Sequence, residues 1–353
     1  MSEDRYSRQI RLKGFGPDSQ ARLQQSKILI VGMGGLGIPA ALYLNAMGVG
    51  TLGLMDADTI ALHNLQRQVL YGEADVGKSK LHVAIQQLQD RNKGTQLIPH
   101  DAFLDRSNAM AIIEPYDLVI DASDNFATRY LINDACVILN KPFVYGALHA
   151  FEGQVSVFNH HNGPTYRCLF PTPPQLEEIP NCDENGVLGV VPGIIGSLQA
   201  LEAVKVLTGL GQVLSGELLI YDGLHQESRK IRFEKNGSLP KITALEQHYD
   251  GLPCTFLDSI SSEGYLEGVG AHLLIDVREP HEFDDDHLPQ ALNIPLSELE
   301  PWSRVAQINE PIYLICKSGQ RSRAAQRALS QWIPEHKLVN IEGGMDQIGN
   351  RCR

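Results

Sequence analysis

The sequence predicts an α/β protein, with a mostly parallel sheet, an antiparallel extension of that sheet and a smaller second α/β domain. Three observations predict this fold class. Apolar segments alternate with helical stretches through the first half of the chain, which is typical of a parallel sheet covered on both faces. Beyond Gly153 the pattern changes to strand-like segments around one long helix. The length of 353 residues suits about two domains, each with its own core.

The parallel part of the sheet is expected to contain strands at residues 27–31, 51–56, 96–100, 117–121 and 142–146. The antiparallel part is expected at 155–158, 218–221 and 229–233, with the long helix at about 194–207. A polar stretch that contains glycine and proline begins at Glu234 and is typical of a linker. We therefore expect domains at 1–236 and 254–353, joined by a linker at 237–253.

The first strand runs directly into a glycine-rich turn with Gly32, Gly34, Gly35 and Gly37, which opens the helical stretch 36–47. A nucleotide-binding G-x-G-x-x-G motif requires this context, because glycines let the backbone approach phosphates and the helix start offers N–H groups. The second strand ends in Asp56, at roughly the twenty-residue spacing where an acid binds ribose in Rossmann-like folds. These features alone suit an NAD enzyme equally well.

Three polar side chains beyond Asp56 favour a triphosphate over a dinucleotide. Asn64, Arg67 and Lys80 lie within a short span of the chain. Such groups suit a polyphosphate better than the second half of a dinucleotide, which is uncharged apart from the pyrophosphate. The alternative is that Arg67 and Lys80 are solvated surface charges. The pattern predicts that the nucleotide is ATP.

Acidic residues follow the fourth strand, in the sequence Asp121-Ala122-Ser123-Asp124-Asn125. The carboxyl end of a parallel strand faces the ligand crevice of such a sheet. Asp124 is therefore well placed to hold Mg²⁺ against phosphate oxygens. The alternative makes Asp121 and Asp124 caps of a helix that begins near Phe126.

These motifs together resemble the MoeB, ThiF and E1 family of adenylating enzymes, which activate ubiquitin-like carriers. The resemblance covers residues 1 to about 235 and adds three motifs: Arg5-Tyr6-Ser7-Arg8-Gln9-Ile10, Asn64-Leu65-Gln66-Arg67-Gln68 and Gly77-Lys78-Ser79-Lys80. It implies an E1/ThiF fold in which the nucleotide and its magnesium are bound by Asp56, Asn64, Arg67, Lys80, Asp124 and Asn125. It also implies that Arg8 enters the active site of the other subunit of a homodimer.

A second candidate site follows the apolar strand 312–315, in the loop Cys316-Lys317-Ser318-Gly319-Gln320-Arg321. A cysteine at this junction meets successive backbone N–H groups and the positive end of a helix that runs from Ser322, with cations beside it. Such surroundings favour a thiolate nucleophile. The alternative is a buried cysteine that serves as a small apolar residue.

Residues from about 254 onward resemble a rhodanese domain, through 274–280, 287–295, the Cys316 loop and Glu342-Gly343-Gly344. Related phosphatases have a loop one residue longer, so the resemblance implies that Cys316 carries a persulfide sulfur. A nearby acidic cluster is expected to be a solvated loop, at Glu282, Asp284, Asp285 and Asp286.

Family members often hold structural zinc with two Cys-x-x-Cys pairs, which this sequence lacks. The first pair is reduced to Thr165-Tyr166-Arg167-Cys168, and residues 222–236 contain no cysteine, so we expect no zinc. Cys182 lies where the family carries a loop cysteine that attacks the activated carrier or resolves a disulfide with it. Asp183 and Glu184 disfavour its thiolate, and the alternative is an exposed thiol without a catalytic role.

The charge of the chain argues against two classes of partner. A formal net charge of −12 and a pI near 5.4 predict no binding to nucleic acid or to anionic membranes. The uncharged run from 187 to 201 is broken by glycine and proline, so we expect no membrane span. The charged residues near the N-terminus are untypical of a signal peptide, and we expect a cytoplasmic location.

The two resemblances together imply ATP-dependent adenylation of a small ubiquitin-like sulfur carrier at its C-terminal Gly-Gly. Sulfur from a Cys316 persulfide would then convert the carrier to a thiocarboxylate, with thiosulfate or a cysteine desulfurase as the donor. Two alternatives stay open. An NAD-dependent oxidoreductase would leave Arg67, Lys80 and the Cys316 loop unexplained. A non-catalytic carrier-binding scaffold would not need the phosphate-binding and thiolate positions.

Overall fold

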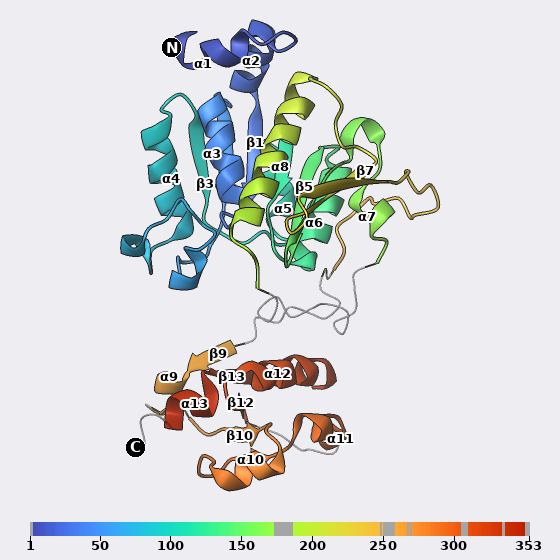
Figure 1. Ribbon diagram of the computed structural model, residues 1–353. Coiled ribbons are helices and arrows are strands. Elements are labelled where there is room, and N and C mark those ends of the chain that lie inside the picture. Colours follow the sequence, from blue (N-terminus) through green and yellow to red (C-terminus); the bar gives the residue numbers. More distant parts are fainter. Residues whose placement is uncertain are drawn as a thin grey trace. The chain divides into compact units, whose positions relative to one another are not determined.

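The computed structural model describes residues 3–172, 186–247, 249, 258–266, 268, 270–304, 310–333 and 336–349. The chain divides into two compact units, Met1–Gly251 and Leu252–Arg353. Each unit contains a sheet with helices packed against it (Figure 1). This arrangement confirms the predicted fold class.

The sheet of the first unit has the strand order β3-β2-β1-β4-β5-β6-β7-β8. The strands are β1 (Lys27–Val31), β2 (Thr51–Met55), β3 (Gln96–His100), β4 (Leu118–Asp121), β5 (Phe143–His149), β6 (Glu152–Phe158), β7 (Glu217–Asp222) and β8 (Glu227–Arg232). Pairing is parallel from β3 through β5 and antiparallel from β5 through β8. The predicted change of pattern beyond Gly153 therefore marks the change of strand direction.

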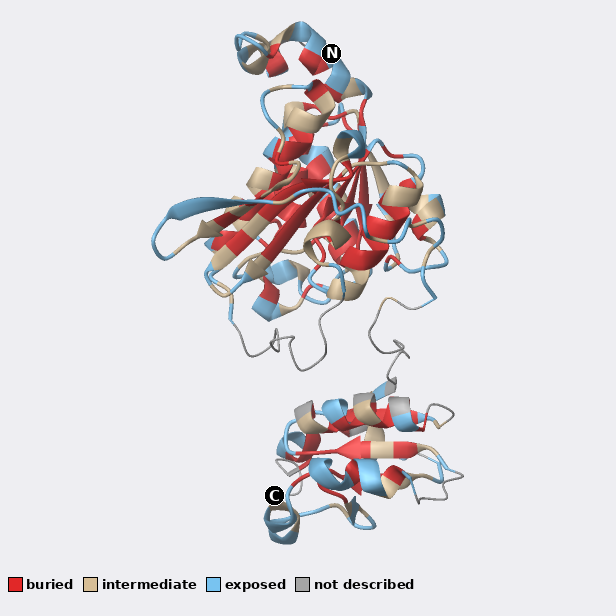
Figure 2. Ribbon diagram, turned by 90° about the vertical axis from the view of Figure 1, so that its right-hand side faces the viewer, coloured by how far each residue is buried: buried red, intermediate tan, exposed pale blue. Residues whose placement is uncertain are grey.

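The helices of the first unit are α1 (Glu3–Ile10), α2 (Gly16–Gln25), α3 (Gly37–Met47), α4 (Lys80–Arg91), α5 (Ala109–Ile113), α6 (Phe126–Ile138), α7 (Tyr166–Leu169) and α8 (Val190–Thr208). The alternation of side chains along β1 divides the core into two. Ile28 and Ile30 join a cluster with α3, α4 and α8, whereas Leu29 and Val31 join one with α5 and α6. The strands between these layers are mostly buried, and β8 is exposed (Figure 2).

Helix α8 begins at Val190, earlier than the predicted start near 194. Pro192 and the neighbouring glycines suggested a break, but proline is tolerated in the first turn, where N–H groups have no partner within the helix. Among the described residues, α8 is the one helix long and apolar enough to cross a bilayer. Its buried residues, including Ile195 and Ala203, pack in the first core cluster, as in a central helix of an α/β domain.

The sheet of the second unit is parallel throughout, with the order β11-β10-β12-β13-β9. The strands are β9 (Asp258–Ser261), β10 (Leu273–Asp276), β11 (Leu292–Asn293), β12 (Ile312–Ile315) and β13 (Leu338–Glu342). The helices are α9 (Ser262–Leu266), α10 (Pro280–Asp285), α11 (Leu299–Ser303), α12 (Gln320–Trp332) and α13 (Gly344–Gly349). Helix α12 packs on one face and α13 on the other, so Cys316 follows a central, buried strand.

Candidate functional site

The glycine turn between β1 and α3 is close-packed. Gly32 has φ +100°, and a Cβ there would lie 2.7 Å from the carbonyl oxygen of Ala122. A Cβ on Gly37 would lie 1.8 Å from the carbonyl oxygen of Gly32. Larger residues are therefore excluded at both positions, and the turn places the start of α3 beside the Asp121–Asn125 loop.

Asp56 directly follows β2 and is bound to the glycine turn. Its carboxylate accepts hydrogen bonds from the backbone N–H groups of Met33 and Asp58, each at 2.8 Å. Burial raises the pKa of Asp56 above its ordinary value, while these two hydrogen bonds and the charge of Lys80 act in the opposite direction. A carboxylate has about four acceptor positions, so Asp56 can also accept ribose hydroxyls.

Lys80 begins α4 and is 7% exposed. Its Nζ lies 2.7 Å from a carboxylate oxygen of Asp58, which is itself largely exposed. Lys80 is thus paired with Asp58, which lies two residues after the predicted ribose acid Asp56. Lys80 is therefore not a solvated surface charge. A bound polyphosphate would meet a cation that already faces this end of the sheet.

Arg67 and Asn64 belong to one short segment. The Oδ1 of Asn64 accepts the backbone N–H of Ala61 at 3.0 Å, which fixes the buried Asn64 side chain. The half-buried Arg67 bonds to the carbonyl of His63, and a Cβ on Gly35 would lie 3.5 Å from its Cδ. A Cβ on Gly34 would lie 3.6 Å from Gln68 Nε2, so this segment lines the glycine turn.

The loop after β4 separates the two acids that sequence analysis considered together. Asp121 is fully buried and accepts the backbone N–H and the hydroxyl of Ser123, at 3.1 and 2.6 Å. Asp124 is exposed. Asn125 caps α6, since its Oδ1 accepts the N–H of Thr128 at 2.9 Å, so the cap is not an aspartate. Asp124 therefore remains available to a ligand.

The donor set at this loop fits Mg²⁺. Magnesium typically takes one or two carboxylates and completes its shell with phosphate oxygens and water. Asp124 is an exposed carboxylate at the carboxyl end of β4, and Asn125 donates to it at 3.5 Å. Among the described residues there is no group of three or more His, Cys, Asp or Glu that could hold a metal ion unaided.

The sequence patterns did not single out Arg129, which also supports this loop. This buried guanidinium donates to the carbonyl oxygen of Ser123 at 3.3 Å. It lies over the rings of Phe126 and Tyr145, at 5.2 and 5.6 Å from their centroids. The available signal was an arginine inside a mostly apolar helix. Arg129 and Asp121 together fix the loop that carries Asp124.

Arg8 lies away from the glycine turn of its own chain. The ring of Tyr6, in the same helix, packs against Gly48, and Tyr6 OH accepts from Asn92 at 3.1 Å. Helix α1 therefore sits at the C-terminal end of α3, whereas the glycine turn is at its N-terminal end. Eleven residues of helix separate these ends by about 16 Å. The exposed Arg8 is not brought together with the other predicted nucleotide ligands.

Cys182 lies outside the described residues. The described chain before it contacts α6, and the described chain after it contacts the segment that lines the glycine turn. The carbonyl oxygen of Thr172 accepts the hydroxyl of Tyr130 in α6 at 2.8 Å. On the other side, a Cβ on Gly189 would lie 2.1 Å from the carbonyl oxygen of Gln66.

Cys316 occupies the predicted place between β12 and α12. It is 1% exposed, and its Sγ accepts the backbone N–H of Gly319 at 3.2 Å and the hydroxyl of Ser322 at 3.4 Å. Lys317 and Ser318 are exposed, and Gln320 is the first residue of α12. Hydrogen bonds from two donors would stabilise negative charge on the sulfur.

The start of helix α13 explains Gly344 in the Glu342-Gly343-Gly344 motif. The backbone N–H groups of Met345 and Asp346 donate to the carbonyl oxygens of Cys316 and Lys317, each at 2.9 Å. A Cβ on Gly344 would lie 2.2 Å from the Cys316 carbonyl oxygen, so this approach requires glycine. With two of its carbonyls held by α13, the loop directs the N–H of Gly319 towards the sulfur.

Arg321 pairs with Glu282, a residue that was expected to lie in a solvated acidic loop. Glu282 lies in helix α10, and its carboxylate contacts both terminal nitrogens of Arg321, at 2.5 and 2.7 Å. This pairing lowers the pKa of Glu282 to about 2. The predicted solvated acidic loop is therefore wrong for Glu282, because the packing of α10 brings it to the cysteine loop.

Around Cys168, polar contacts occupy the region where family members often have paired cysteines. The Cys168 sulfur accepts the N–H groups of Thr165 and Asn236, each at 3.4 Å. Arg167 binds both carboxylate oxygens of the buried Asp134 at 2.8 Å and Glu246 at 2.7 Å. Through Glu246, these contacts attach part of the predicted linker to the first unit.

Arg167→Ala is expected to lower the free energy of unfolding of the first unit by about 3–5 kcal/mol, because it leaves Asp134 buried without its cation. Chemical denaturation of the full chain checks this. Glu246→Gln is the matched control and should cost less than about 1 kcal/mol, since Glu246 is half exposed. Equal stability of Arg167→Ala and the parent protein would contradict the assignment.

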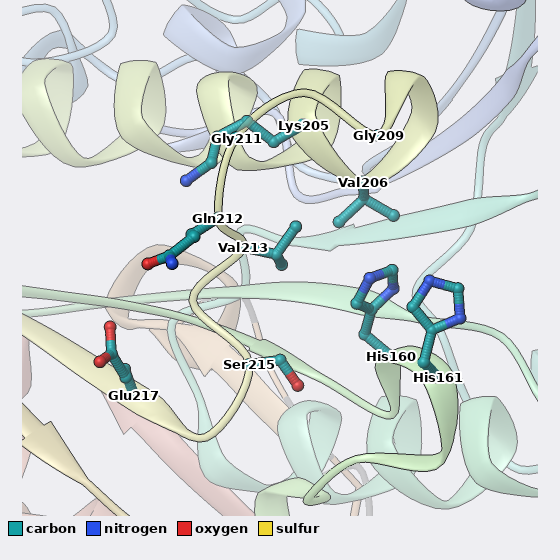
Figure 3. A pocket seen from close by; sticks show the side chains of 10 residues that line it. All are labelled: His160, His161, Lys205, Val206, Gly209, Gly211, Gln212, Val213, Ser215 and Glu217. Carbon is teal, nitrogen blue, oxygen red and sulfur yellow. The ribbon is translucent and has the colours of Figure 1, made fainter.

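A separate cavity of about 460 Å³ lies between the end of α8 and β7 (Figure 3). His160 and His161 lie side by side in it, with ring centroids 4.0 Å apart, and Lys205 and Glu217 also contribute to its lining. None of its lining residues is a predicted site residue. The cavity is therefore not part of the nucleotide or cysteine site.

The fold and the two sites define a class: an α/β domain with a glycine turn of the nucleotide-binding type, joined to a smaller α/β domain whose central strand runs into a cysteine loop. The ThiF family model matches residues 6–241, and the Rhodanese-like domain model matches residues 263–351. The chain therefore belongs to the ThiF family and carries a rhodanese-like domain, as its motifs predicted.

Curated relatives match both domains together. The chain is 43% identical over 369 residues to "Adenylyltransferase and sulfurtransferase MOCS3" of Drosophila persimilis, covering 97% of this chain and 82% of that protein. It is 40% identical over 373 residues to the protein of the same name from Aedes aegypti, covering 97% and 85%. These matches give no support to an NAD-dependent oxidoreductase or a non-catalytic scaffold.

Solved structures share the fold of the first unit. E. coli MccB superposes with a TM-score of 0.61 and 22% identity, over 70% of this chain and 75% of that one. A second E. coli MccB structure, whose title names ATP, gives a TM-score of 0.60 and 21% identity, over 68% and 74%. At this identity the likeness concerns the fold alone.

Proposed function

We propose that this chain uses ATP to activate the C-terminal carboxylate of a ubiquitin-like carrier and then converts it to a thiocarboxylate. The names of the relatives and the two family matches support this function. The observation that carries it is that one chain holds both a glycine turn, with the buried Lys80 and the exposed Asp124 as candidate phosphate and magnesium ligands, and a cysteine loop at Cys316. A protein that bound only a nucleotide would not need the second.

In the first step, a carboxylate oxygen of the carrier attacks the α-phosphorus of ATP, and pyrophosphate leaves with the electrons of the broken P–O bond. Lys80 and Arg67 stabilise negative charge on the phosphates, and the glycine turn supplies backbone N–H groups. Lys80 exchanges its contact with Asp58 for the polyphosphate. Magnesium, held by Asp124, would neutralise phosphate charge. The product is an acyl-adenylate, which has a good leaving group.

In the second step, the outer sulfur of a Cys316 persulfide attacks the acyl carbon, and AMP leaves. The product is an acyl disulfide between the carrier and Cys316. A thiol then attacks the Cys316 sulfur and forms a disulfide with it, so the S–S bond to the carrier breaks and the thiocarboxylate leaves. Cys182 or an external thiol would supply the two electrons.

ATP–pyrophosphate exchange tests this proposal directly. Each small protein that ends in Gly-Gly from the same organism would be added to the full chain with labelled pyrophosphate. Exchange that depends on one such carrier would support adenylation and identify the partner. Absence of exchange with every carrier would contradict the proposed substrate class.

We further propose that the chain acts as a homodimer. Apolar side chains on α3 and α8 are exposed, among them Tyr43 (57%), Val190 (61%) and Leu201 (50%). A second copy is the occupant that also explains Arg8, which lies at the far end of α3 from the glycine turn of its own chain. Arg8 would then complete the partner's phosphate site.

A mixture of Arg8→Ala and Asp124→Ala chains is expected to regain activity that neither variant has alone. Each mixed dimer contains one intact site, so random subunit exchange should restore roughly a quarter of the parent rate. ATP–pyrophosphate exchange measured before and after mixing checks this. If the rate of the mixture stays at the sum of the separate variants, Arg8 does not act across a dimer.

A further inference from the structure

Arg321 is a charged residue of the cysteine loop, and Glu282 fixes its guanidinium in place. Its Nη1 and Nη2 each bind one carboxylate oxygen of Glu282, at 2.5 and 2.7 Å. The two side chains are 36% and 24% exposed. Such two-point pairing orients the guanidinium and balances its charge.

Glu282 is held in this position by residues that flank its helix. Its Oε2 accepts the backbone N–H of Glu279 at 3.2 Å, and the charge-paired carboxylate has a pKa of about 2, so it is ionised at physiological pH. The buried Arg278 binds Asp276 at 2.7 Å and the carbonyl oxygen of Asp286 at 2.6 Å. These contacts anchor both ends of α10 to the sheet, so the fold itself fixes Glu282 beside the cysteine loop.

This pairing has a consequence for the sulfur donor. Thiosulfate carries two negative charges, and its sulfonate group must be held by a cation while its outer sulfur meets Cys316. An alkyl persulfide presents the same reactive sulfur without a sulfonate. Glu282 opposes the first donor by repulsion and by occupying Arg321, and it affects the second much less.

We propose that Glu282 is a specificity-determining residue that withholds Arg321 from sulfonate-bearing donors, so that the loop takes sulfur from an alkyl persulfide. In that step the Cys316 thiolate attacks the outer sulfur of R–S–SH. The donor S–S bond breaks, R–S⁻ leaves, and the proton on the transferred sulfur passes to the leaving thiolate. The products are a Cys316 persulfide and R–SH. This inference rests on the proposed role of Cys316.

The test compares Glu282→Gln with the parent full chain. Persulfide on Cys316 is released with cyanide and measured as thiocyanate, with thiosulfate or glutathione persulfide as the donor. Gln keeps an oxygen that can accept the Glu279 N–H. The variant is expected to raise kcat/KM for thiosulfate about tenfold, chiefly through a lower KM, while the value for glutathione persulfide changes less than about twofold.

Two further variants separate specificity from loop damage. Glu279→Gln removes a neighbouring exposed carboxylate and should leave both donors unchanged. Adding Arg321→Gln to Glu282→Gln should cancel the gain with thiosulfate. The proposal is overturned if thiosulfate kinetics do not improve, or if both donors improve equally. If neither donor loads Cys316 in the parent protein, the proposed sulfur-carrying role itself fails.

Discussion

Cys316→Ala is expected to reduce thiocarboxylate formation by at least about 10⁴-fold, because it removes the atom that carries the transferred sulfur. Its Sγ is the acceptor of the Gly319 and Ser322 hydrogen bonds, and alanine provides no replacement. Adenylation should continue within about twofold of the parent rate, since the substitution lies in the other domain. Carrier mass spectrometry measures the first activity, and ATP–pyrophosphate exchange measures the second.

Cys168→Ser is the matched control for this substitution. It also removes a thiol, but serine can still accept the backbone N–H groups of Thr165 and Asn236. This variant should keep both activities. Thiocarboxylate formation by Cys316→Ala at the parent rate would show that the sulfur travels by another route.

Asp124→Ala is expected to lower ATP–pyrophosphate exchange about 10³-fold, because it removes the exposed carboxylate that would hold magnesium against the phosphates. Persulfide formation on Cys316 should be unchanged. This outcome is the reverse of that for Cys316→Ala. The two variants together therefore assign one half-reaction to each domain.

Asp117→Asn controls for the loss of a carboxylate near β4. Asp117 lies at the other end of this strand, where it accepts the backbone N–H of Lys27 at 2.8 Å, and asparagine can keep that bond. Exchange should therefore be preserved in this variant. Equal losses in Asp117→Asn and Asp124→Ala would mean that the effect comes from the fold and not from a nucleotide ligand.

The sequence predicted those parts of the sites that depend on local patterns and on sheet topology. Asp56, Asp124 and Cys316 each follow a parallel strand, and in such sheets the carboxyl ends of the strands face the ligand. The expected strands of the first unit were found within a few residues of their predicted positions. The role of Gly32 and Gly37 could be predicted because a glycine motif of this spacing, between a strand and a helix, is typical of a nucleotide-binding turn.

Contacts between distant side chains could not be predicted in the same way. Glu282 is 39 residues from Arg321, and Glu246 is 79 residues from Arg167, so no local period links either pair. Both acids lie in segments that composition marks as solvated or as linker. Arg129 was missed because its role depends on the loop geometry that Asp121 creates.

The most direct test of the central claim is the intact mass of a Gly-Gly-terminated carrier after incubation with the full chain, ATP and a persulfide donor. The account predicts a mass increase equal to the exchange of one oxygen for sulfur, which requires ATP and is lost in both Cys316→Ala and Asp124→Ala. A carrier that is adenylated but never gains sulfur, or one that gains it without ATP, would contradict the coupling of the two sites.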